Sequence, residues 1–226
     1  MDSETTRRRI FQLLADALEY PRPGLVEAAR ECAALLAADN IAAAACMHEF
    51  RAFVEKTPRG RLEEIYTSTF DLDATWYPYV GYHLFGESYK RSVFMLELNE
   101  RYRAHGFSVA GELPDCLAVL LRFLAVCDDA ALSGEIICDA LLPALDHMDL
   151  WGTQATVPSP ESCGGGMTTP LQSTADERPD RARQGYRPAL QALRLVLRHF
   201  PANTLQIGDD SNEKQPTFYG REQKEC

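Results

Sequence analysis

Five histidines and seven cysteines are the side chains of this sequence best suited to metal binding or redox chemistry. The histidines are scattered, and none forms the H-x-x-x-H or H-x-x-E-H spacing that places two ligands on one helical face. The cysteines include no C-x-x-C pair, and several lie in apolar runs, where cysteine acts as a small hydrophobic residue. We therefore expect no metal site, and a reducing compartment. The two sets are His48, His83, His105, His147, His199 and Cys32, Cys46, Cys116, Cys127, Cys138, Cys163, Cys226.

A glycine-rich stretch and a pair of aspartates are two further candidates for chemistry. Residues 163–167 read Cys-Gly-Gly-Gly-Met, but no Gly-Lys-Ser/Thr follows, so a linker is favoured over a phosphate-binding loop. Asp71 and Asp73 could bind a cation or share a proton, because neighbouring carboxylates raise one another's pKa. No third ligand lies at a useful spacing, so carboxylates at a helix end are the favoured interpretation.

The richest segment for recognition is Tyr79–Glu87, which holds three aromatic residues, a histidine and two glycines. An acidic segment, residues 70–73, precedes it, and the basic pair Lys90 and Arg91 follows. An apolar and aromatic surface flanked by both signs of charge suggests a place to bind something. Taken alone, His83 would still be interpreted as a packed structural histidine.

Composition limits the classes of partner. The chain has 226 residues, 46% of them hydrophobic and 25% charged, which is typical of a protein with a sizeable core. A formal net charge of −10 argues against nucleic acid, since phosphate binding needs a basic face, and is compatible with a cationic partner. No apolar run approaches the roughly 20 residues of a membrane span, so we expect no membrane insertion.

The N-terminal segment Arg7–Phe11 is superficially similar to a twin-arginine export signal. Asp16 and Glu19 interrupt the region that such a signal keeps apolar, and no small-residue cleavage site follows. We therefore expect the protein to stay in the cytoplasm.

Hydrophobic periodicity predicts helices along most of the chain. The segment Glu112–Asp115 is interpreted as a helix start, because Pro114 suits the first turn and the carboxylates suit the helix dipole. Residues 72–86 are predicted to form a helical turn within an ordered loop, and Pro143 would bend a later helix. The expected helices cover residues 4–19, 25–38, 41–56, 62–69, 87–105, 112–124, 132–150 and 186–200.

The predicted fold class is all-α, a single bundle of about eight helices with no β-strand. Residues 1–200 would form one domain. Residues 152–185 are rich in Pro, Ser, Thr and Gly and are predicted to be a flexible insertion before the last helix. Residues 201–226 are predicted to be a disordered tail.

Four blocks of this sequence, spread over about sixty residues, together resemble the nitrate reductase delta-subunit family of molybdoenzyme assembly chaperones, which is related to the redox-enzyme maturation proteins. Agreement of several blocks at once makes the resemblance specific. The blocks are Tyr66-x-x-x-Phe70-Asp71, Tyr79-x-x-Tyr82-His83-Leu84-Phe85-Gly86-Glu87, Lys90-Arg91 and Glu112-Leu113-Pro114-Asp115, the last followed by Leu117, Leu121 and Phe123.

The resemblance implies an all-helical cytoplasmic chaperone without catalytic residues. Such a protein binds the N-terminal peptide of a molybdenum-containing catalytic subunit while that client receives molybdopterin guanine dinucleotide, and it holds no cofactor stably itself. The residues that the resemblance assigns to peptide binding are Asp71, Tyr79, Tyr82, His83, Phe85, Arg91, Glu112 and Asp115, and those that it assigns to the structure of the motif are Phe70, Gly86 and Pro114.

A division of roles within this set is our hypothesis. Tyr79, Tyr82 and Phe85 would line a groove for an amphipathic client helix, while Asp71 and Asp115 would meet the client's cations at the rim. Pro114 and Gly86 would shape the backbone, and Phe70 would belong to the core.

Two other functions and several clients stay open at this point. The chain could be a permanent structural subunit of an oxidoreductase, or an enzyme with a helical metal or nucleotide site. The client could be a nitrate reductase or a relative that acts on chlorine oxyanions, selenate, sulfides or hydrocarbons. We expect a monomer or a mixture of monomer and dimer.

Overall fold

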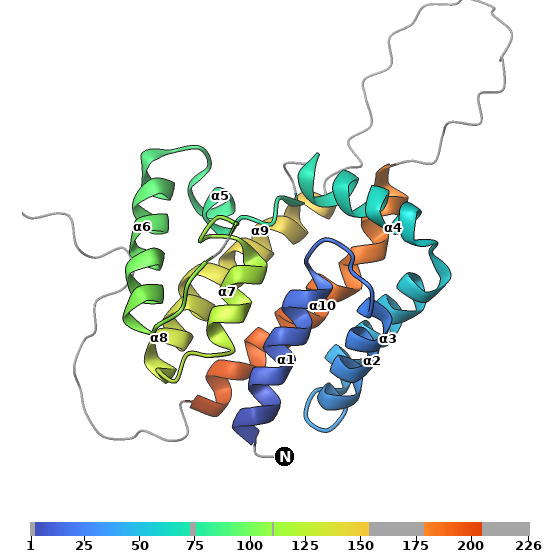
Figure 1. The fold of residues 1–226 in the computed structure, drawn as a ribbon, viewed down its shortest axis with the longest axis horizontal. Coiled ribbons are helices and arrows are strands. Elements are labelled where there is room, and N and C mark those ends of the chain that lie inside the picture. The colour runs from blue at the N-terminus through green and yellow to red at the C-terminus, as the bar shows by residue number, and fades with distance from the viewer. Residues whose placement is uncertain (1–2, 73–75, 110, 154–178, 205–226) are drawn as a thin grey trace, which may run out of the picture.

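The computed structural model describes residues 3–72, 76–109, 111–153 and 179–204, and within these ranges the chain is helical (Figure 1). The one β-type contact described is an isolated antiparallel bridge between Tyr79 and Cys116. The all-α prediction is therefore confirmed. The helices are α1 (Ser3–Ala17), α2 (Leu25–Leu36), α3 (Ile41–Lys56), α4 (Arg59–Tyr66), α5 (Val80–Phe85), α6 (Tyr89–Ala104), α7 (Leu117–Leu124), α8 (Ala130–Glu135), α9 (Leu142–Thr153) and α10 (Pro179–Thr204), with π-helical segments at Thr67–Asp71 and Ile136–Leu141.

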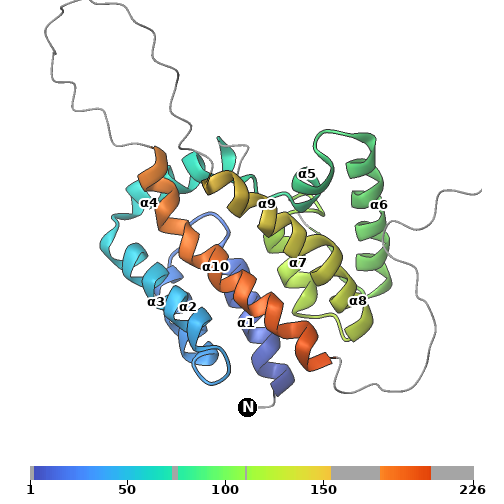
Figure 2. The ribbon, with the colours of Figure 1, turned by 180° about the vertical axis from the view of Figure 1, so that it is seen from behind.

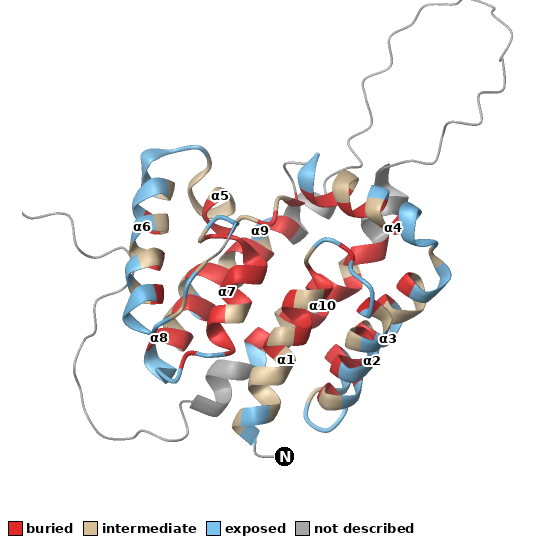
Figure 3. Cartoon of the chain, in the orientation of Figure 1, coloured by how far each residue is buried: buried red, intermediate tan, exposed pale blue. Residues whose placement is uncertain are grey.

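The two ends of the described chain form the middle of the bundle. Helices α1 and α10 lie between a group formed by α2, α3 and α4 and a second group formed by α5 to α9 (Figures 1 and 2). Helix α1 contacts α2, α7 and α10, while α10 contacts α3, α4, α8 and α9. Buried apolar residues from all of these elements except the short α5 to α6 connection form one hydrophobic cluster in the interior (Figure 3).

Helix α10 docks through a glycine and a tyrosine. Tyr186 is fully buried, and its ring lies 5.2 Å from Phe70, 5.5 Å from Phe50 and 5.7 Å from Tyr66, measured between ring centroids. Gly185 lies so close to the ring of Phe53 that a Cβ atom there would approach it to 2.2 Å. The last helix, predicted at residues 186–200, is confirmed, and α10 begins earlier than expected, at Pro179.

The predicted helix start at Glu112–Asp115 is wrong, because α7 begins at Leu117. The backbone of this segment is engaged elsewhere: Val80 N–H donates to Asp115 O at 2.8 Å, and Leu117 N–H donates to Pro78 O at 2.7 Å. These bonds hold Cys116 in an extended conformation. A contact with a distant segment has therefore overridden the local helix signal.

The helix predicted at 132–150 is longer in the structure and is continuous from Ala130 to Thr153. It contains Pro143, which has no N–H and whose ring would crowd the carbonyl one turn earlier. The turn before it is π-helical, and Leu142 N–H accordingly donates to Ile137 O, five residues back. The wider turn accommodates the proline without ending the helix.

The predicted insertion and tail fall largely outside the described residues. Helix α9 extends to Thr153 and α10 covers residues 179–204, so the ends of both predicted segments are helical. Residues 154–178 and 205–226 lie outside the described ranges. The predicted turn within residues 72–86 is confirmed as α5, and no helix of the described chain is long and apolar enough to cross a membrane.

The contact between Gly185 and Phe53 predicts that Gly185→Ala destabilises the protein by about 2 kcal/mol, because an extra methyl group in a filled interface forces its neighbours to move. Gly134→Ala is the matched control, since Gly134 lies in α8 and a Cβ there would meet no atom within 4 Å. That change should stabilise the protein by about 0.5–1 kcal/mol through helix propensity. Denaturant unfolding of both variants measures the difference, and equal effects would contradict the packing of α10.

Candidate functional site

The segment Tyr79–Glu87 and the segment Glu112–Asp115 lie side by side, as the sequence predicted. The backbone bonds of Val80 to Asp115 and of Leu117 to Pro78 join them, and Tyr79 pairs with Cys116 across the bridge. Helix α5 follows immediately, and α6 then packs against α5. The candidate site is therefore built from α5, the first turns of α6 and the chain that enters α7.

An ion pair lies at the centre of this arrangement. Arg91 Nε donates to Asp115 Oδ2 at 2.8 Å and Nη2 donates to Oδ1 at 3.4 Å, a two-pronged contact of guanidinium and carboxylate. The side chain of Asp115 is 0% exposed. The expectation that Asp115 meets a client's cations at a rim is therefore wrong, because its carboxylate is fully buried and already bound to Arg91. Arg91 is largely buried as well, and its guanidinium also lies 5.3 Å from the ring centroid of Tyr79.

Gly81 makes room for this ion pair, and sequence reasoning did not single it out. A Cβ atom at Gly81 would lie 2.7 Å from Asp115 Oδ2, 3.0 Å from the ring of Phe94 and 3.1 Å from Arg91 Cγ. Only the absence of a side chain lets α5 approach the pair this closely. A glycine among aromatic residues inside a predicted helical turn was the signal that could have identified it.

Tyr79 is half-buried between the two segments. Its hydroxyl donates to Glu112 Oε1 at 3.4 Å, and the same carboxylate oxygen accepts the N–H of Leu113. Burial is the largest and the Glu112 carboxylate the next of the effects that raise the pKa of Tyr79 to about 12. The phenol is therefore neutral at physiological pH and acts as a hydrogen-bond donor. Glu112 itself is exposed, and it is the carboxylate of this segment that faces solvent.

Tyr82 and His83 connect the site to α9. Tyr82 packs edge-on against Tyr77, with ring centroids 5.2 Å apart. His83 Nε2 lies 2.7 Å from Tyr77 O, a contact that requires the proton on Nε2, and His147 Nδ1 lies 2.6 Å from His83 O. Burial lowers the pKa of His83, and the nearby His147 and Arg91 lower it further, against the opposing effect of the bond to Tyr77. His83 is therefore neutral at pH 7.

The remaining motif residues lie in the core or beside the two segments. Phe70 is buried against Tyr66, with ring centroids 4.9 Å apart, which confirms it as core. Phe85 is half-buried beside Phe94, and Gly86 ends α5 with φ +62° and ψ −151°, a conformation available mainly to glycine. Pro114 accepts a hydrogen bond from the Tyr102 hydroxyl at 2.8 Å.

Asp71 is exposed at the end of the first π-helical segment. Its carboxylate adds to the effects that raise the pKa of Tyr79, so it lies within electrostatic range of the site. Asp73 lies outside the described residues.

An outward row of apolar residues on α6 was missed by sequence reasoning. Phe94, Leu98 and Tyr102 are buried in the core. Tyr89, Val93 and Leu96, spaced by four and three residues, form a second row that is exposed to solvent, with Tyr89 82% and Leu96 57% exposed. We call these three residues the outer row. Leu113, at the neighbouring segment, is exposed too.

Among the described residues, no group of three or more His, Cys, Asp or Glu side chains could hold a metal ion. Burial raises the pKa of the Cys32 thiol to about 12 and that of Cys116 to about 11, so neither is a thiolate at neutral pH. Cys116 and Cys127 are buried, whereas Cys138 is exposed.

Comparison with known proteins identifies a family for this chain. The family model described as "Nitrate reductase delta subunit" matches residues 36–154, a little more than half of the chain, and this range includes every residue of the candidate site. No curated protein matches the chain.

The burial of Asp115 predicts that Asp115→Ala destabilises the protein by about 3 kcal/mol, because Arg91 is left as an unpaired charge in a largely buried place. The double variant Arg91→Met with Asp115→Leu should recover much of that loss. Glu31→Ala, which breaks an exposed pair with Arg9, is the control and should cost about 0.5 kcal/mol. Urea unfolding measures all three, and equal losses for Asp115→Ala and Glu31→Ala would contradict the buried pair.

The lowered pKa of His83 predicts a loss of stability on acidification. The unfolded chain takes up a proton at the ordinary histidine pKa of about 6.5, whereas His83 in the folded protein resists protonation. Below pH 6.5 the free energy of unfolding therefore falls by up to about 1.4 kcal/mol per pH unit, until the pH reaches the lowered pKa of the folded protein. His83→Gln should flatten the profile of unfolding free energy between pH 7.5 and 5, because the variant lacks the one histidine whose proton uptake differs between the two states. His48→Gln, at an exposed position on α3, is the control and should keep the slope of the parent protein. If His83→Gln also kept the slope of the parent protein, the pH dependence could not be assigned to His83.

Proposed function

Because the chain belongs to the nitrate reductase delta subunit family, we propose that it is an assembly chaperone that binds the N-terminal region of a molybdoenzyme catalytic subunit. In this role the chain does no covalent chemistry. The molybdopterin guanine dinucleotide is cargo of the client, and the chaperone keeps the client open for its insertion. The proposed place of action is the cytoplasm, where the cofactor is inserted before the client is complete.

The outer row of α6 is the observation that supports this proposal most directly. Exposed apolar side chains that follow one another along a helix indicate a surface that a partner covers. Tyr89, Val93 and Leu96 have the spacing that suits an amphipathic helix laid along α6. The row begins directly after α5, so the same client could also contact the half-buried aromatic residues Tyr82 and Phe85.

The charge of the protein supports a basic client. Leader peptides of the proposed kind are basic and amphipathic, and the formal net charge of this chain is −10. Glu112 and Asp71 are exposed beside the site, and Glu100 follows Leu96 by one turn on α6. In this proposal these three carboxylates take the rim role that was expected of Asp115, and the buried ion pair holds the surface in shape from below.

A permanent subunit of an oxidoreductase is the second candidate function. The printed description of the family is that of a subunit, and an exposed apolar row would equally suit a stable interface. The two functions differ in lifetime. A chaperone is absent from the mature, cofactor-loaded enzyme, whereas a subunit purifies with it at fixed stoichiometry.

The proposal predicts that a synthetic peptide from the N-terminus of the client catalytic subunit binds in titration calorimetry. Tyr89→Ser and Leu96→Ser should each weaken binding at least about fivefold, equivalent to about 1 kcal/mol. Tyr82→Ala should weaken it as well. Ile41→Ser, at an exposed apolar position on α3, is the matched control and should leave the affinity unchanged.

Three results would count against the proposal. Failure of the parent protein to bind any part of that subunit would exclude the client. Equal weakening by Ile41→Ser and Leu96→Ser would remove the outer row from the interface. Recovery of this chain in the mature enzyme at fixed stoichiometry would favour the permanent subunit.

A further inference from the structure

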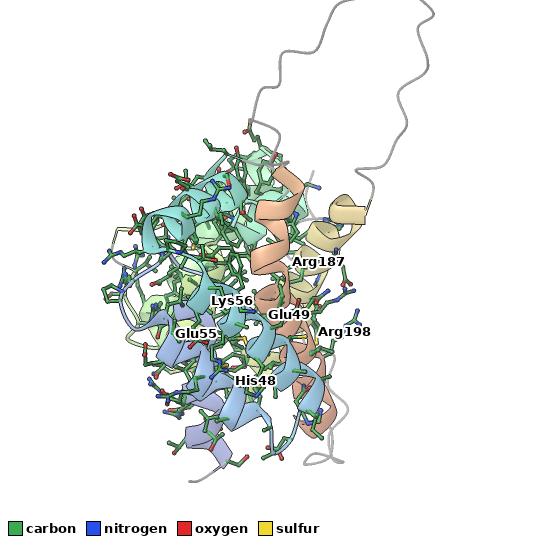
Figure 4. The ribbon with its side chains drawn as sticks, turned by 90° about the vertical axis from the view of Figure 1, so that its right-hand side faces the viewer. His48, Glu49, Glu55, Lys56, Arg187 and Arg198 are labelled. Atoms are coloured by element: carbon green, nitrogen blue, oxygen red, sulfur yellow. The ribbon has the colours of Figure 1, made fainter. Side chains whose placement is uncertain are left out.

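The outer row of α6 holds three of the eight large apolar side chains that are exposed among the described residues. Such a group is unfavourable in water whether or not a client is present. Figure 4 shows a different side of the bundle, where the labelled side chains come from α3 and α10 and are all polar or charged. They are His48, Glu49, Glu55, Lys56, Arg187 and Arg198. A cover over the outer row would therefore lower the free energy of the protein while no client is bound.

The residues after α10 have a sequence that suits such a cover. Residues 205–226 lie outside the described ranges, and within them residues 208–217 are all polar, glycine or proline. Phe218 and Tyr219 then supply two aromatic rings, and Arg221 and Lys224 supply cations. Aromatic rings beside cations are also the chemistry of the basic, amphipathic client proposed above. The end of the chain therefore carries, on a polar linker, a segment that resembles the proposed client.

The linker starts close to α6. Helix α10 contacts α8, and Figures 1 and 2 both show the C-terminal end of α10 beside α8. Helix α8 is joined to the last turn of α6 by an ion pair, in which Arg101 Nη1 lies 3.1 Å from Glu135 Oε2. Packed helices lie about 8–10 Å apart, so two such steps and the radius of α6 place its outer face about 25 Å from the end of α10.

The length of the linker matches this distance. Phe218 follows Thr204, the last residue of α10, by 14 residues. A chain of that length spans about 20 Å on average as a coil and about 45–50 Å when fully extended. A tether whose average span matches the distance to its site gives an effective concentration of about 1 mM. An interaction with a dissociation constant of only about 0.1 mM would then be about nine-tenths formed.

We propose that the segment 217–224 docks on the outer row of α6 and covers it until a client takes its place. Phe218 and Tyr219 pack against the apolar side chains around Leu96, and Arg221 lies near the exposed carboxylate of Glu100. The segment acts as a tethered competitor, which a client with a larger contact displaces. Displacement by a client rests on the proposed function, whereas docking of the segment does not.

The experiment measures docking in trans, with no client present. The probe is a dye-labelled synthetic peptide of residues 212–225, followed by fluorescence anisotropy. Full-length protein with Phe218→Ser and Tyr219→Ser, whose own segment cannot dock, should bind the peptide with a dissociation constant of about 0.1 mM. The parent should bind it about tenfold more weakly, because its own segment competes. Asn212→Ser with Gln215→Ser, in the polar linker, is the matched control and should bind like the parent.

A second pair of variants locates the docking surface. Leu96→Ser, added to the protein with Phe218→Ser and Tyr219→Ser, should weaken peptide binding at least about fivefold, because it removes an apolar contact from the outer row. Ile41→Ser, at an exposed apolar position on α3, should leave the affinity unchanged. A thermal melt of each variant verifies that the fold is intact, so that a lost signal reports binding.

Three results would overturn the proposal. They are equal peptide affinity in the parent and in the variant with Phe218→Ser and Tyr219→Ser, equal weakening by Leu96→Ser and Ile41→Ser, and a parent dimer in sedimentation that Phe218→Ser with Tyr219→Ser dissociates. The dimer would mean that the segment covers a second copy. None of these measurements contains a client, so their failure leaves the proposed function standing. Conversely, a protein that docks its own segment but binds no client peptide would refute the proposed function alone.

Discussion

The buried carboxylate of Asp115 is the constraint on which the geometry of the candidate site depends. An ionised carboxylate removed from water costs several kcal/mol unless a cation and hydrogen bonds compensate it. Arg91 supplies both, and the pair fits only because Gly81 has no side chain. These three residues come from α6, from the segment before α7 and from α5, so the three segments fix one another's positions. Tyr79 then lies between Arg91 and Glu112 as a consequence.

The second constraint is the return of the chain through α10. Tyr186 enters an aromatic cluster built by α3, α4 and the π-helical turn after α4, and burying such a ring contributes about 1.5–3 kcal/mol. The same helix contacts α8 and α9 in the other group of helices. Because one helix contacts both groups, α10 fixes the position of the two groups relative to each other.

Periodicity was sufficient to predict helices such as α3 (Ile41–Lys56), because burial of one face leaves a 3.6-residue pattern in the sequence. Periodicity failed where a contact with a distant segment of the same chain determines the local structure. The helix signal of Glu112–Asp115 was overridden by backbone bonds to Pro78 and Val80, and the burial of Asp115 depends on Arg91, 24 residues earlier. Neither contact leaves a local signal. The family resemblance identified the right segments, while the roles of Asp115 and Gly81 needed coordinates.

Helix α6 separates stability from binding within one element. Phe94, Leu98 and Tyr102 account for its attachment to the core, and they would do so whatever lay on its other side. The outer row adds nothing to that packing, so folding alone gives no reason for Tyr89 and Leu96 to be apolar. Apolar residues on both faces also cancel the amphipathic signal that normally identifies a surface helix, which is why the row escaped notice in the sequence. A bound partner would explain why this surface is apolar, since the fold does not need it and exposure to water disfavours it. Substitutions in the outer row therefore test binding without disturbing the Arg91–Asp115 pair beneath it.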